Sequence, residues 1–197
     1  MQKITLFDES LHAVEYDKHA ETKKKFIQII EDIKATSMNT NDFNHMLVYK
    51  SPPGLQMNNA FHDLITCKGL QDFSMQKIHD VILPKDKKFA ITSMWATIIP
   101  KYALLVPKEH EGVYYGTYFL HSPTESGMIL FHNNIDDSWY SKFGNTINNE
   151  HNHNVRSLNM PEGGIYLIPS YTKVGTSTNM YDDPNVQINF VIDIVDN

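Results

Sequence analysis

Apolar and polar residues alternate with a period of two through much of the second half of the chain. In the clearest run, residues 186–194, Val186, Ile188 and Phe190 alternate with Gln187 and Asn189. This period is typical of a β-strand with one buried face. Similar runs predict strands at residues 89–99, 102–106, 113–121, 128–131 and 164–169. One or two weaker strands are expected within residues 139–160.

The N-terminal half shows a helical period instead. Apolar residues spaced three or four apart predict a helix over residues 17–35. A second helix is predicted over residues 72–83, where Pro84 ends it. Helices come early and strands come late along the chain. This order predicts an α+β fold in which two helices brace one face of an antiparallel β-structure.

The length and composition indicate one domain. The chain has 197 residues, which we divide into an N-terminal bracing part, 1–84, and a β core, 85–197. Its net charge of −6 is not accompanied by a basic block, which argues against nucleic acid as a partner. Since no apolar run is long enough to span a membrane and the first residues do not resemble a signal peptide, we expect no membrane partner and no secretion.

Six short motifs follow one another in an order that resembles a known family. The order is similar to that in a phage and bacterial family of predicted 2-oxoglutarate/Fe(II) oxygenases, over about residues 51–193. The resemblance implies a double-stranded β-helix, the jelly roll of cupins and oxygenases. The motifs are Trp95, Lys-Glu-His at 108–110, Gly-Thr-Tyr-Phe at 116–119, Ser-Gly at 126–127, Ile-Pro-Ser-Tyr at 168–171 and the strand 186–194.

The resemblance also implies where a metal and its co-substrate would bind. It places the iron ligands at Lys108, His110 and Val174, and the arginine that binds 2-oxoglutarate at Asn185. A protonated lysine has no lone pair for a metal, and valine has no donor atom. Asparagine cannot form the bidentate charged pair that arginine forms with a carboxylate. We therefore predict a degenerate site with no catalytic residues and no metal.

Two other groups of residues are candidates for binding. His151 and His153 have the i, i+2 spacing that places two imidazoles on one side of a strand, and with His110 they form an alternative metal site. Aromatic residues are enriched at protein contacts. Tyr102, Tyr114 and Tyr171 are therefore candidates for the mouth of the barrel or for an interface.

These observations predict a non-catalytic structural or interaction module without cofactors. The resemblance suggests a bacteriophage virion component of the neck or tail, located in the virion or the host cytoplasm. We expect protein partners, as a homo-oligomer or within a larger phage assembly. One alternative is an active Fe(II)/2-oxoglutarate-dependent hydroxylase with an unorthodox site. Another is a cupin-like protein that binds a small molecule inside the barrel.

Overall fold

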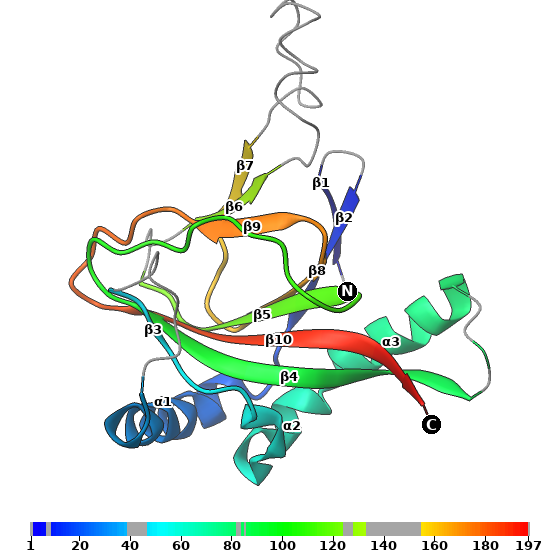
Figure 1. Cartoon of the computed structure of the whole chain (residues 1–197), viewed down its shortest axis with the longest axis horizontal. Helices are drawn as coiled ribbons and strands as arrows, with labels where there is room; N and C mark the ends of the chain where they lie inside the picture. The colour runs from blue at the N-terminus through cyan, green and yellow to red at the C-terminus, as the bar shows by residue number, and fades with distance from the viewer. Residues whose placement is uncertain are drawn as a thin grey trace, which may run out of the picture.

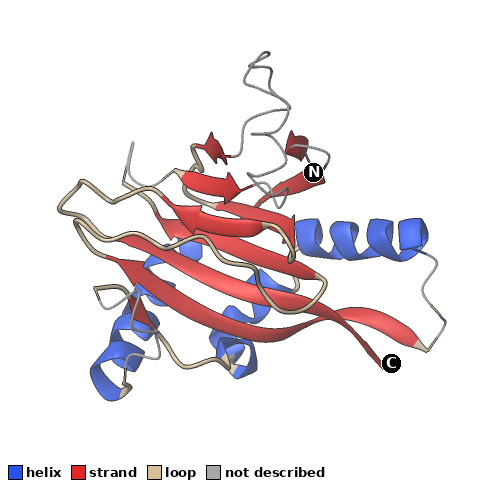
Figure 2. Cartoon of the chain, turned by 45° about the horizontal axis from the view of Figure 1, so that its top comes forward, coloured by secondary structure: helices blue, strands red, loops and turns tan. Residues whose placement is uncertain are grey.

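Two antiparallel β-sheets pack face to face, and helices cover the outer face of the larger sheet (Figures 1 and 2). The computed structural model describes residues 2–6, 9–38, 47–81, 84, 86–123, 128–132 and 155–196. The larger sheet has seven strands in the order β1-β2-β8-β5-β10-β4-β3. Their bounds are β1 Gln2–Leu6, β2 Glu9–Glu15, β3 Tyr49–Lys50, β4 Lys87–Ile99, β5 Tyr114–His121, β8 Gly164–Pro169 and β10 Asn185–Asp196.

The smaller sheet has three strands in the order β7-β6-β9. They are β6 Ile129–His132, β7 Val155–Leu158 and β9 Lys173–Thr176. An extended segment that contains Lys108 runs alongside β9, on the edge of β9 opposite β6. Lys108 and Val174 form an isolated antiparallel bridge there. This segment widens the smaller sheet over the face of the larger one. The result is the double-layered barrel of a jelly roll.

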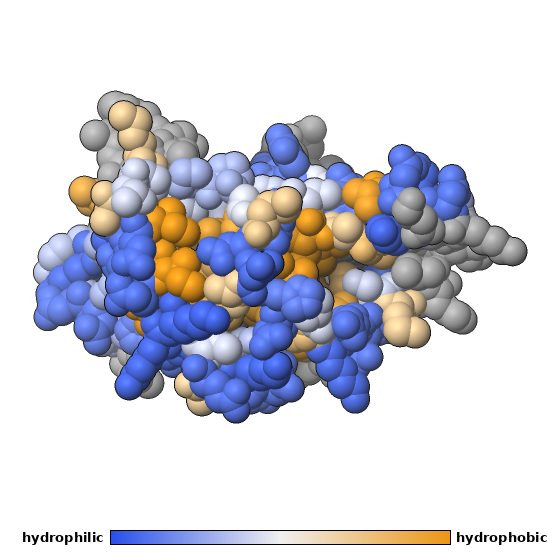
Figure 3. Space-filling view, turned by 90° about the horizontal axis from the view of Figure 1, so that it is seen from below, coloured by the Kyte–Doolittle hydropathy of each residue, from blue (hydrophilic) through white to orange (hydrophobic). Residues whose placement is uncertain are grey.

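The helices pack on the opposite face of the larger sheet (Figure 1). They are α1 His19–Thr36, α2 His62–Ile65 and α3 Lys68–Val81. Helix α1 buries Phe26 and Ile30, which lie four residues apart on one face, and exposes most of its charged residues. Seen from the helix side, apolar side chains show between hydrophilic surfaces (Figure 3).

Strand β10 separates two hydrophobic cores by its alternation. Ile188 and Phe190 belong to the core between the larger sheet and the helices. Val191 belongs to the core between the two sheets, together with Phe119 and Phe131. The polar residues of the alternating pattern therefore face the inside of the barrel, which is where a ligand would bind.

The predicted α+β jelly roll with two bracing helices is confirmed. Helix α1 lies within two residues of its prediction, and the second helix begins at Lys68, four residues earlier than predicted. Residues 102–106 do not form a regular strand. Strands β2 and β9 were not predicted, and β7 is one of the weak strands expected in residues 139–160.

Candidate functional site

A small cavity lies inside the barrel, between the inner faces of the two sheets. Its volume is about 40 Å³. A buried water needs about 10–15 Å³ on this measure, so the cavity has room for roughly three water-sized groups. Its walls combine apolar, neutral polar and basic residues: Lys50, Trp95, Thr97, Leu105, Val106, Lys108, His110, Tyr115, Thr117, Ile129, Val174, Gly175, Thr176, Gln187 and Asn189.

The segment 105–110 forms one wall of the cavity because it is hydrogen-bonded along β9. The Thr176 N–H donates to the Leu105 carbonyl at 2.9 Å, and the Lys108 N–H donates to the Val174 carbonyl at 3.1 Å. This approach requires a glycine on β9. A Cβ atom at Gly175 would lie 2.6 Å from the Leu105 carbonyl oxygen. Gly175 thus fixes how closely Lys108 approaches the smaller sheet.

A row of buried polar residues forms the opposite wall. Asn189 accepts a hydrogen bond from the Tyr115 hydroxyl at 2.6 Å and donates one to Thr97 Oγ1 at 2.8 Å. Burial raises the pKa of Tyr115 above its usual range, so this hydroxyl keeps its proton. Gln187 is only 2% exposed, and its Nε2 has no hydrogen-bond partner among the described residues. This wall therefore presents a buried donor to the cavity.

Three basic side chains gather at the mouth of the cavity. Burial is the main cause that lowers the pKa of His110 to about 3, and the ammonium groups of Lys108 and Lys50 lower it further. The His110 ring stacks on Tyr115 with centroids 3.6 Å apart. Lys50 lies over the Trp95 ring, 4.7 Å from its centroid. The mouth therefore carries two positive charges beside a neutral imidazole.

A wider groove continues from the mouth to the surface. Its volume is about 550 Å³, and it shares Lys50, Trp95, Lys108 and His110 with the inner cavity. Gly112 in this groove has φ +81°, and a Cβ there would lie 2.3 Å from Val191 Cγ1. The groove and the inner cavity together form one continuous site, with the lysines at their junction.

The structure brings the three predicted metal positions to one site. Lys108, His110 and Val174 all line the inner cavity, and Lys108 pairs directly with Val174. Among these three residues, only His110 has a side chain with a lone pair that can bind a metal ion. No group of three His, Cys, Asp or Glu residues in the described part of the chain could hold a metal ion. The described residues therefore do not form a three-ligand iron site.

Two further predictions concern positions near this site. Asn185, predicted at the arginine position, is buried, and its Nδ2 lies 3.4 Å from Ser122 Oγ. It does not line the inner cavity, whereas Gln187, two residues further along β10, does. His151 and His153, the alternative metal ligands, lie outside the described residues.

The three candidate aromatic residues lie in different places. Tyr102 and Tyr171 are exposed on loops. Tyr114 instead packs against Phe73 and Phe89 on the helix face of the larger sheet. The alternation of β5 explains this position, because Tyr115 faces the barrel and its neighbour must face the helices. A barrel-mouth position for Tyr114 is therefore wrong.

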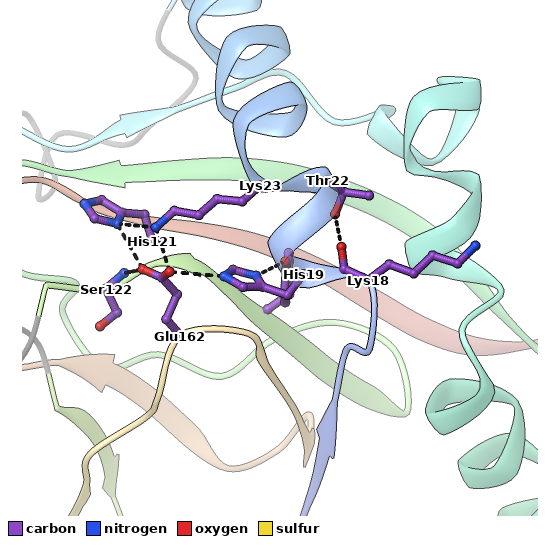
Figure 4. A network of polar contacts seen from close by, with 8 residues as sticks. Lys18, His19, Thr22, Lys23, His121, Ser122 and Glu162 are labelled. Carbon is purple, nitrogen blue, oxygen red and sulfur yellow. Dashed lines mark hydrogen bonds and ion pairs between the residues drawn. The ribbon is translucent and has the colours of Figure 1, made fainter.

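A second polar cluster, on the helix side, surrounds Glu162 (Figure 4). Its carboxylate accepts from Lys23 at 2.6 Å and from the Ser122 N–H at 3.1 Å. It also contacts His19 at 3.1 Å and His121 at 3.0 Å. Burial raises the pKa of Glu162, but these four hydrogen bonds outweigh it and lower that pKa to about 2. The cluster connects α1 to the end of β5 and was not predicted from the sequence.

Sequence comparisons identify no relatives, whereas structural comparison does. No protein-family profile and no curated protein matches the sequence. The α-ketoglutarate-dependent non-heme epimerase SnoN from nogalamycin biosynthesis has a TM-score of 0.67 and 11% identity, over 94% of this chain and 78% of SnoN. HygX from Streptomyces hygroscopicus, with nickel, 2-oxoglutarate and hygromycin B bound, has a TM-score of 0.61 and 11% identity, over 93% of this chain and 82% of HygX.

A third similar structure is EctD from S. alaskensis with 2-oxoglutarate and 5-hydroxyectoine, with a TM-score of 0.65 and 12% identity, over 93% of this chain and 71% of EctD.

No helix in the described part of the chain is both long and apolar enough to cross a membrane. The predicted non-catalytic phage module is contradicted, because these neighbours are catalytic enzymes. The predicted absence of cofactors is contradicted too, because SnoN has been solved with Fe³⁺ and α-ketoglutarate, another name for 2-oxoglutarate. The chain has the fold of the 2-oxoglutarate/Fe(II)-dependent oxygenases.

Proposed function

We propose that this chain uses 2-oxoglutarate, or a closely related 2-oxo acid, in a reaction on a small molecule, with the barrel mouth as its active site. The observation that carries this proposal is the convergence of Lys50, Lys108 and the neutral His110 on one cavity between the sheets. Two ammonium groups beside a partly enclosed cavity attract a carboxylate. The fold neighbours named above were solved with 2-oxoglutarate or its equivalent bound.

The protein side chains have separate roles in this proposal. Lys108 and Lys50 bind the carboxylate of the 2-oxo acid at the mouth. His110, held flat against Tyr115, offers a neutral imidazole that can donate or accept one hydrogen bond at the same place. The wider groove, of about 550 Å³, accommodates the molecule that reacts.

The iron that the fold implies does not fit the described residues. They supply one imidazole, from His110, and the neighbouring positions Lys108 and Val174 carry no lone pair for a cation. Where iron is bound in this fold, it supplies the oxidising chemistry.

Binding is tested by calorimetry with 2-oxoglutarate and with 2-oxobutyrate on the full chain. We expect millimolar or tighter binding of at least one compound, and about tenfold weaker binding in Lys108→Met and in Lys50→Met, since each loses a charged hydrogen bond. Lys34→Met, which changes an exposed lysine on α1, is the matched control and should bind as the wild type does. Absence of binding, or equal affinity in all variants, would overturn the proposal.

The reaction is tested separately, with the same proteins incubated in air with ascorbate and each 2-oxo acid, both with and without added Fe(II). The expected result is consumption of the bound acid with release of CO₂ and of succinate or propionate. O₂ is the oxidant: one of its oxygen atoms enters the acid, and the other enters the co-substrate or, with ascorbate as the reductant, water. The metal content is measured in parallel. Binding without any consumption of either acid would refute the catalytic part of the proposal.

A further inference from the structure

We infer that the site selects a ligand whose buried end is neutral and accepts hydrogen bonds, such as a carboxamide, rather than a second carboxylate. This inference rests on the proposed binding of a 2-oxo acid and defines which acid the site prefers. It starts from the inner end of the cavity, where Gln187 lies. The charged residues of the cavity lie at its mouth and the uncharged polar residues lie deeper.

Strand register shows which residues are deep. In the larger sheet Val191 lies opposite Ser93 and Tyr115, and this row borders the outer groove. Gln187 lies two rows further in, opposite Thr97. Lys50 pairs with Thr97 in this row, but its ammonium lies over the Trp95 ring, one row nearer the mouth, and Lys50 also lines the outer groove. Neither Gln187 nor Thr97 lines the outer groove, and both line the inner cavity. The inner end of the cavity is thus made by neutral side chains of β4 and β10.

Hydrogen-bond donors predominate at this inner end. Gln187 is almost fully buried, and its Nε2 has no partner within the described residues. Thr97 Oγ1 already accepts from Asn189, and Thr176 Oγ1 already accepts from the Leu105 N–H at 2.9 Å. Each hydroxyl therefore retains its own proton for donation. A buried donor without a partner is costly, so an acceptor oxygen on a ligand is strongly favoured here.

Charge decides which acceptor is preferred. A carboxylate buried at this end would lose its hydration and would meet neutral donors only, because Lys50 and Lys108 serve the first carboxylate at the mouth. A carboxamide presents one acceptor oxygen without a charge. Its three heavy atoms match a cavity of about 40 Å³. Its N–H₂ group can donate in turn to the Gln187 carbonyl, which completes an amide–amide pair.

The inference is tested with glutarate and its monoamide, two probes of equal length that differ only in the charge of one end. Calorimetry on the wild type should show the monoamide binding about tenfold more tightly than glutarate. In Gln187→Arg the order should reverse, because a guanidinium forms a bidentate pair with a carboxylate. In Gln187→Leu, which removes the donor and adds no charge, the preference for the monoamide should fall below about twofold.

Gln71→Arg makes the same substitution at an exposed position on α3 and should leave the preference unchanged. A melting curve of each variant confirms that it is folded. Glutarate binding as tightly as the monoamide to the wild type would overturn the inference, as would an unchanged order in both Gln187 variants. Failure of the monoamide to bind also overturns it. If 2-oxoglutarate binds in the same experiments and depends on Lys108, the proposed function stands independently of that result.

Discussion

The Glu162 cluster allows a stability prediction that can be worked out from the structure. Glu162→Gln keeps the size of the side chain and removes its charge, which leaves the half-buried Lys23 without its carboxylate at 2.6 Å. Lowering the pKa of Glu162 from 4.5 to about 2 corresponds to about 3 kcal/mol in favour of the charged form. Because the Glu162 side chain is 29% exposed, water screens part of this energy. We expect a loss of about 1–2 kcal/mol in the free energy of unfolding at pH 7.

The pH dependence gives the prediction its sign. The folded-state pKa of Glu162 lies below its unfolded value, so the stabilisation is fully present above about pH 4.5 and is lost as the pH falls towards about 2. Urea unfolding should therefore show a difference between the wild type and Glu162→Gln that is constant from pH 7 to pH 5. The difference should shrink steadily below that range.

An exposed ion pair provides the control. Asp182 lies 2.8 Å from Lys101, but its side chain is 92% exposed, so Asp182→Asn should cause no measurable change. A double-mutant cycle with Lys23→Met isolates the energy of the Lys23–Glu162 contact. The reasoning is refuted if Glu162→Gln is as mild as Asp182→Asn, or if the difference persists unchanged at pH 2.

Three other predictions concern the barrel, and a fourth concerns assembly. Tyr115→Phe removes the donor to buried Asn189 and should cost about 1–2 kcal/mol in chemical denaturation, whereas an unchanged midpoint would contradict the bond. Gly175→Ala places a Cβ against the Leu105 carbonyl and should cost about 1–3 kcal/mol while weakening 2-oxo acid binding; a neutral effect on both would show that the segment is not held as described. The His110 imidazole, whose pKa is lowered to about 3, should stay neutral down to about pH 4 in an NMR titration, and a midpoint near 6.5 would contradict its burial beside two lysines. The homo-oligomer expected from the sequence remains a prediction, and light scattering at high concentration would contradict it by showing only monomers.

The architecture was predictable because it depends on periodicity. The alternation in β10 separates Ile188 and Phe190 from Gln187 and Asn189, as the sequence indicates. The sequence predicted one buried face, however, and the structure buries both: Ile188 and Phe190 lie on the helix side, and Gln187 and Asn189 lie inside the barrel. Short or irregular strands carry too few residues for this signal. Strand β9 has four residues including Gly175, and its position depends on pairing with β6 and with the segment at Lys108.

The site was predictable only in part. The motif order placed Lys108 and Val174 together, and the structure pairs them. It could not predict the Glu162 cluster, because His19 and Lys23 lie more than one hundred residues from Glu162 along the chain. Alternation on a strand shows which face a residue occupies, but not its depth. Depth depends on which rows of the larger sheet the smaller sheet covers.

Because alternation does not show depth, the sequence could not distinguish Asn185, the predicted position of the 2-oxoglutarate-binding arginine, from Gln187, which lines the cavity. Both face the inside of the barrel, and only the register with β4 and β5 distinguishes them. The distinction matters for the chemistry. With Asn185 as the anchor, the site would have lost its ligand-binding end, because Asn185 Nδ2 already has Ser122 Oγ as its neighbour. Gln187 lines the cavity, and its buried Nε2 has no partner among the described residues. Our proposal therefore assigns the inner end of the ligand to Gln187 rather than to Asn185, and the comparison of glutarate with its monoamide tests this assignment.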